Sequence, residues 1–295
     1  MELRDIEIFL TLAEELHFGR TAERLHLTPA RISQSVKKQE RRIGAPLFER
    51  TSRQVALTPV GRQLYEELRP IHRSLRDTLD RAVLSARGKT DVLRIGMIGG
   101  GIAHDLRPVL DAFAAHHQEC ELRIRNIGFN DPFGPLRAGE IDIAILWLPV
   151  KEPDLTVGPV AFTEPVVLAL AASHPLADAE SVSYEDLGDQ TVVDAVVPAY
   201  WREVVIPSHT PSGRPIKIGP HVNDLLELIP VLASGEAVSP VHAQTARYFA
   251  RPDIDFVPIR DAALAHWALV WRTASQTDLI RDFAQIVEEH GTLAL

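Results

Sequence analysis

Residues 18–38 read Phe-Gly-Arg-Thr-Ala-Glu-Arg-Leu-His-Leu-Thr-Pro-Ala-Arg-Ile-Ser-Gln-Ser-Val-Lys-Lys, and this stretch decides the fold of the N-terminal part. Residues 18–25 are long enough for a helix of about two turns. Thr28 can cap a second helix, and Pro29 suits its first position because the N–H that proline lacks would be unpaired there anyway. The stretch therefore predicts two short helices joined by a tight turn, the helix-turn-helix arrangement.

The second of these helices has one apolar and one polar side. Ile32 and Val36 lie one turn apart and would face a core, and Gly44 marks the end of the helix. Polar and basic residues recur on the opposite side at spacings of four, three and four. This stripe and its flanks consist of Ala30, Arg31, Ser33, Gln34, Lys37, Lys38 and Arg41. A helix with such an outer face is typical of one that enters the major groove of DNA.

The position of each side chain along this helix predicts what it would contact. Near the N-terminus, Ser33 and Gln34 can donate and accept hydrogen bonds at base edges, and Arg31 can read guanine or hold a phosphate. Further along, Lys37 and Lys38 are better placed for phosphates, which give affinity but carry no sequence information. A single basic residue is more often simply solvated, so the ordered combination carries the prediction.

The segment that follows predicts a short basic hairpin. Residues 46–59 read Pro-Leu-Phe-Glu-Arg-Thr-Ser-Arg-Gln-Val-Ala-Leu-Thr-Pro. Such a hairpin after a helix-turn-helix forms the wing of a winged helix. Arg50 and Arg53 would reach the DNA backbone or the minor groove.

A long helix is predicted next, because Thr58 and Pro59 repeat the start signal. Pro70 lies inside it and predicts a bend or a boundary between two helical pieces. Apolar residues alternate at spacings of four and three and make a narrow seam, which favours pairing with a second helix. The seam residues that would mediate dimerisation are Leu64, Leu68, Ile71 and Leu75. The alternative is that the seam packs on the core of its own chain.

Charge divides the 295-residue chain into two parts. Residues 1–90 hold 17 Lys and Arg against 12 Asp and Glu, whereas residues 91–295 hold 14 against 28. This asymmetry indicates nucleic-acid contact at the front and another role behind. No apolar run is long enough for a transmembrane helix, and the charged N-terminus does not look like a secretion signal. The one cysteine, Cys120, cannot form an internal disulfide, and a cytoplasmic location is expected.

In this order the N-terminal motifs resemble the DNA-binding domain of LysR-type transcriptional regulators. The matching segments are residues 1–4, Phe9, 18–27, 28–34, 44–50 and 57–61. The resemblance implies an all-α winged helix-turn-helix over residues 1–62 and a linker helix used for dimerisation over residues 58–90. Carried over position by position, it puts DNA contacts on Thr28, Pro29, Arg31, Ser33, Gln34 and Arg53.

The rest of the chain resembles the effector domain of the same family. After residues 92–98, which predict a buried strand, strand and helix patterns alternate, as in α/β proteins with mainly parallel sheets. The matching segments are residues 93–96, 104–116, 136–143, 174–177 and 231–238. The resemblance implies a bilobed domain over residues 91–295, similar to periplasmic binding proteins. Lobe I would comprise residues 91–162 and 266–295, and lobe II residues 163–265.

Ligands of open α/β sheets bind beyond the carboxyl ends of strands, so these ends predict the effector contacts. Gly99, Gly100 and Gly101 follow the first strand, and their backbone N–H groups could receive a carboxylate. Asn130 follows the second strand and matches a ligand-contact position of the family. At another strand end, Trp147 would face the same cleft.

The inter-lobe wall supplies the remaining candidates for effector binding. These are Asp194, Pro198, Tyr200, Trp201 and Asn223. For each, capping of a loop or ordinary packing is the alternative reading.

Catalytic patterns are incomplete in this sequence. Gly99, Gly101 and His104 fall where a dinucleotide fingerprint needs three glycines, so the third is missing. No nucleophile elbow, phosphate loop or His-Glu-x-x-His motif occurs. We therefore expect no catalytic residue, no metal site and no cofactor. The alternative that stays open is an enzyme or solute-binding module carrying a DNA-binding head.

The sequence thus predicts a regulator that binds specific DNA and responds to a small molecule. The resemblance implies an inverted-repeat operator in double-stranded DNA, RNA polymerase as a partner, and a homodimer or homotetramer. An organic acid or an aromatic metabolite is the expected effector, and no contact with a membrane is expected.

Overall fold

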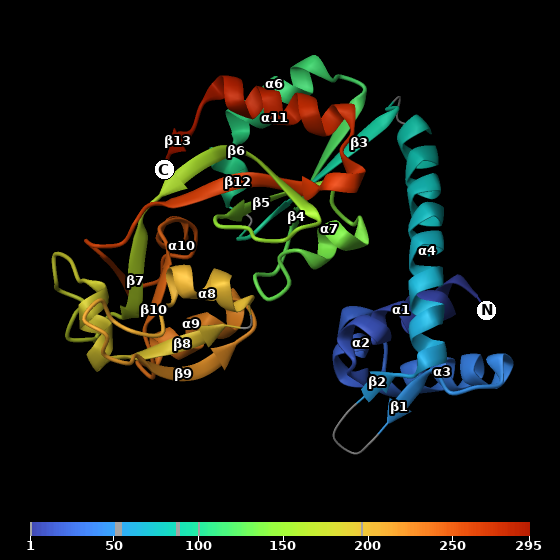
Figure 1. Cartoon of the computed structure of the whole chain (residues 1–295), viewed down its shortest axis with the longest axis horizontal. Coiled ribbons are helices and arrows are strands. Elements are labelled where there is room, and N and C mark those ends of the chain that lie inside the picture. The colour runs from blue at the N-terminus through green and yellow to red at the C-terminus, as the bar shows by residue number, and fades with distance from the viewer. Residues whose placement is uncertain (1, 51–54, 87–88, 100, 196) are drawn as a thin grey trace. The chain divides into compact units, whose positions relative to one another are not determined.

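The computed structural model describes residues 2–50, 55–86, 89–99, 101–195 and 197–295 (Figure 1). The chain divides into two compact units, Met1–Gly88 and Lys89–Leu295. Each has its own buried apolar cluster.

The first unit is a winged helix-turn-helix followed by a long helix, as the sequence predicts. Its elements are α1 Leu3–Glu15, α2 Phe18–Arg24, α3 Pro29–Ile43, β1 Phe48–Arg50, β2 Val55–Leu57 and α4 Pro59–Ala86. The antiparallel pair β1–β2 forms the predicted hairpin, with Phe48 opposite Leu57. Fully buried Phe9, Ile32 and Val36 join α1 and α3 in one core.

The start signals of the two short helices work through side-chain caps. The Nδ1 atom of His17 accepts hydrogen bonds from the backbone N–H groups of Gly19 and Arg20, at 3.1 and 3.2 Å. The Thr28 hydroxyl accepts one from the N–H of Arg31 at 3.3 Å, directly before Pro29 at the first position of α3. These caps pair N–H groups that have no partner inside the helix, so they fix where α2 and α3 begin.

Helix α4 is continuous from Pro59 to Ala86, so the boundary predicted at Pro70 is not found. Leu64 and Leu68 pack against the core of the first unit, which is the alternative reading of the seam for these two residues. In contrast, Ile71 and Leu75 are 66% and 37% exposed.

The second unit contains a six-stranded sheet in the order β13-β6-β12-β5-β3-β4. Its strands are β3 Asp91–Met97, β4 Cys120–Asn126, β5 Ile143–Trp147, β6 Leu155–Glu164, β12 Ala265–Arg272 and β13 Leu293–Ala294. The associated helices are α5 Ile102–Asp105, α6 Arg107–His116, α7 Gly134–Ala138 and α11 Asp278–His290. The sequence predicts mainly parallel strands, but β12 runs antiparallel to both β5 and β6, so the sheet is mixed.

A smaller group of strands completes the second unit. Strand β7 (Val166–Ala171) lies between β10 (Ser239–His242) and β11 (Ile254–Pro258), and β8 (Thr191–Ala195) pairs in parallel with β9 (Lys217–Val222). The helices here are α8 Ala199–Val205, α9 Leu225–Ala233 and α10 Gln244–Tyr248, with 3-10 turns at Tyr184–Asp189 and, near the larger sheet, at Thr273–Ser275. The chain passes between the two groups at residue 165, where β6 runs on into β7 (Figure 1), and returns after residue 258.

Candidate functional site

The outer face of α3 is the first candidate site. All but one of its predicted contact residues are exposed, and Ser33 is half-buried. The exposed ones are Thr28, Pro29, Ala30, Arg31, Gln34, Lys37 and Lys38. Because Ile32 and Val36 take the opposite side into the core, the structure presents this stripe on one free helix face.

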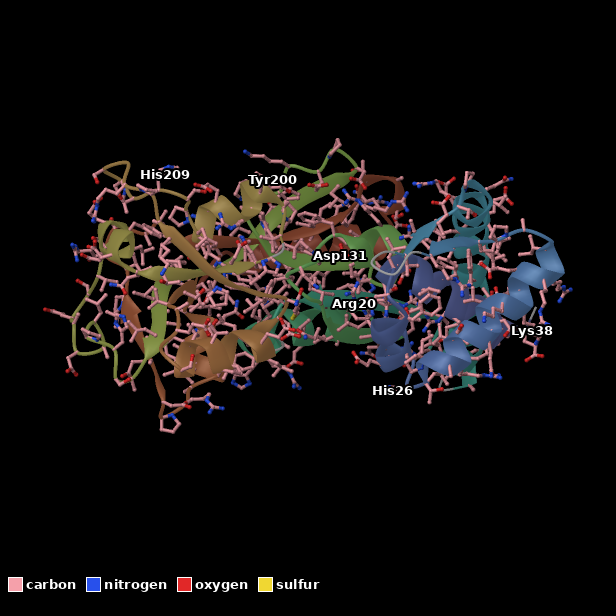
Figure 2. The ribbon with its side chains drawn as sticks, turned by 90° about the horizontal axis from the view of Figure 1, so that it is seen from below. Arg20, His26, Lys38, Asp131, Tyr200 and His209 are labelled. Atoms are coloured by element: carbon pink, nitrogen blue, oxygen red, sulfur yellow. The ribbon has the colours of Figure 1, made fainter. Side chains whose placement is uncertain are left out.

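Lys38, labelled on α3 in Figure 2, differs from Lys37 in that partners for its ammonium are found within its own unit. Its Nζ atom lies 3.2 Å from Asp5 Oδ2 and 3.4 Å from Glu2 Oε1. The other Asp5 oxygen accepts a hydrogen bond from the hydroxyl of Ser35 at 2.8 Å. Burial acts to raise the pKa of Asp5, but the hydrogen bonds from Ser35, Glu2 and Lys38 outweigh it and the pKa is lowered. Lys38 therefore helps to hold α3 against α1.

Arg50 is also engaged inside the first unit. Its guanidinium lies 2.9 Å from a carboxylate oxygen of Glu40 and 5.1 Å from the centre of the Phe18 ring. The other oxygen of Glu40 accepts the backbone N–H of Leu47 at 3.0 Å. Arg50 thus ties the hairpin to α2 and α3. Arg53, the other predicted contact on the hairpin, lies outside the described residues.

The second candidate site is a cavity of about 630 Å³ in the second unit. Its walls come from β4, β5, β8, β9, β10 and β12, from α8, α9 and α10, and from loops that include the one after β3. Apolar side chains such as Ile98, Phe129, Val205 and Leu228 make up most of the lining. Such a volume and such walls suit a small organic ligand.

Four of the predicted effector contacts line this cavity, namely Gly99, Gly101, Trp147 and Trp201. Gly100 lies outside the described residues. The predicted contacts that are not among the lining residues are Asn130, Asp194, Pro198, Tyr200 and Asn223. Asn126 and Phe129, which both precede Asn130 in the chain, line the cavity instead of it.

Several predicted contacts outside the lining have partners of their own. Asp194 accepts a hydrogen bond from Arg202 at 2.7 Å, which lowers its pKa although burial acts to raise it. The phenol of Tyr200 on α8 donates to Glu152 at 2.9 Å (Figure 2). The side chain of Asn223 donates to Glu227 at 2.8 Å. These contacts match the alternative of capping and packing that the sequence left open.

The glycines after β3 meet conformational and packing demands. Gly99 has a φ of +79°, which favours glycine. A Cβ atom at Gly101 would collide with the ring of Tyr248. The N–H of Gly99 donates to Asn126 Oδ1 at 3.1 Å and that of Gly101 donates to the Gly99 carbonyl. These two N–H groups therefore already have acceptors within the protein and are not free to bind a carboxylate.

An aromatic cluster lies in the cavity wall, and two of its members, Trp147 and Trp201, are predicted from the sequence, whereas His242 and Trp267 are not. The indole rings of Trp147 and Trp201 stack in parallel with their centres 3.5 Å apart, and Trp201 Nε1 donates to the Trp147 carbonyl at 2.8 Å. His242 lies beside Trp147 and Trp267, with ring centres 4.8 and 5.0 Å away. Burial lowers the pKa of His242 to about 3, so its ring is neutral near pH 7. His242 and Trp267 lie in short apolar stretches that give the same pattern as ordinary core residues, so the sequence offered no specific signal for these two.

A buried carboxyl group supports the far side of this cluster. Glu164, at the end of β6, accepts hydrogen bonds from the backbone N–H of Gln244 at 2.7 Å and from its side-chain amide at 3.1 Å. Burial raises the pKa of Glu164 to about 7, against the hydrogen bonds and the positive charge of Arg247, which lower it. These contacts fix the start of α10 against β6.

The described residues contain no group of three or more His, Cys, Asp or Glu that could hold a metal ion. Burial raises the pKa of the Cys120 thiol to about 11, so this thiol is protonated near neutral pH. No described helix is both long enough and apolar enough to cross a membrane.

Comparisons with known proteins agree for both units. Residues 3–62 match the family "Bacterial regulatory helix-turn-helix protein, lysR family", and residues 86–292 match "LysR substrate binding domain". The HTH-type transcriptional regulator AlsR of Bacillus subtilis is 29% identical over 290 residues, 97% of this chain and 95% of AlsR. Among solved structures, CbnR, a LysR family transcriptional regulator, matches with a TM-score of 0.64 at 22% identity, covering 98% of this chain and 99% of CbnR. Full-length CbnR complexed with its target DNA gives 0.63 at 23% identity and the same coverage.

Proposed function

Because the chain belongs to the LysR family of transcriptional regulators, we propose that α3 reads operator DNA and that a small molecule in the cavity modulates this binding. The exposed polar face of α3, capped at Thr28 and backed by a separate core, carries the proposal. The relatives that the chain matches are transcriptional regulators, which favours this function over an enzyme.

On DNA, we assign base reading to Arg31, Ser33 and Gln34, near the N-terminal end of α3. Lys37 contributes a phosphate contact that gives affinity without sequence information. Lys38 and Arg50 act mainly through the ion pairs that fix α3 and the hairpin. The CbnR structure with its target DNA supports docking of this domain on a duplex.

Dimerisation through α4 is the second part of the proposal. Four large apolar residues follow at intervals of four and are exposed: Ile71, Leu75, Leu79 and Val83. Exposed apolar residues on successive turns of one helix are stabilised when a second helix buries them. Two heads held in this way would recognise an inverted repeat in double-stranded DNA.

The effector acts, in this proposal, by binding one arrangement of the second unit more tightly than another. It can shift the equilibrium only by this difference in affinity, typically about 1–3 kcal/mol. A change in how the dimers assemble, as homodimer or homotetramer, would then alter contacts with operator DNA and with RNA polymerase. The protein works in the cytoplasm, where chromosomal DNA is located.

The test is binding of the purified full chain to the DNA upstream of its own gene, against random DNA of equal length, over a series of salt concentrations. We expect specific binding that survives excess competitor. Salt-sensitive binding without preference would leave a DNA-binding protein whose operator lies elsewhere. Absence of binding at low salt would contradict the proposed role of α3, since phosphate contacts are strongest there.

A further inference from the structure

The cavity of the second unit has walls that are mainly apolar. Ile127, Val193, Val222 and Leu228 are among its lining residues, and each is buried. The apolar lining continues to the mouth, where Leu226 on α9 lines the cavity and is 76% exposed. Exposed aliphatic surface is stabilised when another apolar group covers it. The walls and the rim therefore both favour an apolar ligand.

The polar groups of the aromatic wall are not presented to the cavity. Trp147 Nε1, His242 Nε2 and the amide oxygen of Gln244 are buried atoms that the protein itself covers. The Trp201 N–H donates to the Trp147 carbonyl at 2.8 Å, and the Ser239 hydroxyl donates to the carbonyl of the next residue at 3.2 Å. These groups are therefore closed to a ligand, and this wall presents ring faces and aliphatic groups.

Three backbone N–H groups beside the cavity already have acceptors. At the start of α9, an N–H of the first turn donates to the carboxylate of Asp224 at 2.9 Å. At the start of α10, the N–H of Gln244 donates to Glu164 at 2.7 Å. In the loop after β3, the N–H of Gly99 donates to Asn126 Oδ1 at 3.1 Å. Free N–H groups at such places attract anions, but here the carboxylates and the amide oxygen of the chain itself occupy them.

The one cation among the described lining residues is balanced within the protein. Arg202 lies 2.7 Å from a carboxylate oxygen of Asp194 and 3.9 Å from one of Glu203. The other charged side chain of the lining is Asp224, which is acidic. Transfer of a charge out of water is unfavourable unless a partner replaces the lost hydration. A carboxylate in this cavity would lose its hydration without gaining a cation that lacks a carboxylate of its own.

We infer that the ligand of this cavity is an uncharged, predominantly apolar molecule that binds by burial of its hydrocarbon surface. This inference rests on the proposed effector role of the cavity. It departs from the organic acid that the family resemblance suggests. Two consequences can be measured, because each buried CH₂ group adds to the affinity and a negative charge subtracts from it.

The test uses two series of unbranched probes, the ketones from hexan-2-one to nonan-2-one and the carboxylates from hexanoate to nonanoate. Binding to the full-length protein at pH 7.5 is followed by calorimetry and by the fluorescence of the tryptophans in the wall. We expect the affinity of the ketones to rise about fourfold with each added CH₂ group. Each ketone should bind at least about ten times more tightly than the carboxylate of the same length. Equal or tighter binding of the carboxylates, an affinity that does not depend on length, or no detectable binding of either series would overturn the inference.

Two neighbouring valines on α8 locate the binding within the cavity. Val205 lines the cavity and is buried, whereas Val204 is 45% exposed and is not among the lining residues. Val205→Thr replaces a methyl group by a hydroxyl at nearly the same volume, so we expect it to weaken nonan-2-one about threefold or more. Val204→Thr is the matched control and should leave the affinity unchanged. Equal effects of the two variants would place the binding outside the cavity and overturn the inference.

The comparison of the two series on the unaltered protein needs no variant, so a misfolded variant does not affect it. Specific DNA binding is measured separately on the same protein. Absence of ketone binding with operator binding intact would refute the ligand class alone, whereas absence of operator binding with ketone binding intact would refute the role of α3 alone.

Discussion

Trp147 on β5 and Trp201 on α8 stack in parallel with ring centres 3.5 Å apart, and the Trp201 N–H donates to the Trp147 carbonyl at 2.8 Å. Trp147 belongs to the six-stranded sheet and Trp201 to the smaller group of strands and helices. The pair therefore joins two parts of the second unit at the wall of its cavity.

Replacement of Trp201 should destabilise the second unit strongly. For Trp201→Ala we expect a loss of about 3–5 kcal/mol in the free energy of unfolding, because a fully buried ring leaves a cavity. Trp201→Phe keeps an aromatic ring but leaves the Trp147 carbonyl unpaired, at a cost of about 1–3 kcal/mol. Urea unfolding measures both. Val204→Ala, at an exposed position of the same helix, should change stability by less than about 0.5 kcal/mol. Equal losses at 201 and 204 would contradict the structural role of the stack.

Gln34 and Lys37 should respond differently when DNA binding is measured. Gln34→Ala should weaken binding to the operator by about 1–3 kcal/mol and relax base preference at one position. Lys37→Ala should weaken binding to all sequences and reduce the salt slope by about 1. Fluorescence anisotropy with operator and random duplexes over a salt series separates the two effects. A loss for Gln34→Ala that is equal on both duplexes would refute its assignment to base reading.

Lys38 should matter less than Lys37 for DNA and more for the fold of the head. Its ammonium lies beside Asp5, whose lowered pKa contributes stability at neutral pH that is lost as the pH falls. We expect Lys38→Ala to raise the pKa of Asp5 and to lower the stability of the head only slightly at pH 7, since the ammonium is largely exposed and solvent screens the pair. Thermal unfolding at pH 7 compared with pH 3 checks this. Identical effects of the two lysine variants on DNA affinity would argue against the distinction.

Glu164 should make the stability of the second unit fall as the pH rises. Its pKa in the folded state is about 7, above the ordinary value of 4.5, so the folded state binds the proton more tightly than the unfolded state. The contribution of Glu164 to the free energy of unfolding is largest below pH 4.5 and is lost as the pH rises through 7, by up to about 3 kcal/mol. His242 acts in the opposite direction, because its lowered pKa costs stability as the pH falls below 6.5.

The difference in unfolding free energy between the unaltered protein and Glu164→Gln, measured by urea unfolding from pH 4 to 9, therefore isolates the contribution of Glu164. A difference that does not vary with pH would exclude the raised pKa. Glu236→Gln, at an exposed position, is the matched control.

The apolar residues of α4 should fall into two groups, one that affects the assembly of dimers and one that affects the stability of the head. Leu79→Asp places a charge on the exposed seam, so we expect dimers to dissociate while the head stays folded. Leu68→Ala removes a contact with the core of the head, and we expect a loss of about 1–2 kcal/mol in its stability with assembly retained. Light scattering gives the mass and circular dichroism the stability. If Leu79→Asp left the mass unchanged, the seam could not be the contact between subunits.

Local signals in the sequence were sufficient for the first unit. Thr28 and Pro29 set the start of α3, and the spacing of Ile32 and Val36 set its buried side, because capping and periodicity act over a few residues. The same signals could not show that Lys38 meets Asp5, since that contact joins residues 33 positions apart. These local signals also could not show that Leu68 packs on the core of the head while Ile71 is exposed, because that difference depends on where the head ends along α4.

For the cavity, the sequence located the region but not most of the contacts. Strand ends pointed to Gly99 and Trp147, and both line the cavity. The side chains of Gln244 and His242 reach the same wall from α10 and β10, about a hundred residues later in the chain. Only the pairing of β10 with β7 and the bond from Gln244 to Glu164 bring them there. Such long-range placement leaves no periodic pattern in the sequence.

The joint between the head and α4 makes the long helix act as a lever. Thr58 donates from its N–H to the Leu47 carbonyl at 3.0 Å and from its hydroxyl to the Pro46 carbonyl at 2.8 Å, and at Gly61 a Cβ atom would collide with that same Leu47 carbonyl. The 28 residues of α4 make an arm about 42 Å long. If this arm tilts by about 10° about one end, its other end moves by about 7 Å, which is close to the rise of two base pairs of DNA. A rigid joint at Thr58 would thus convert a small angular signal into a change of register on the operator, whereas a flexible one would absorb it.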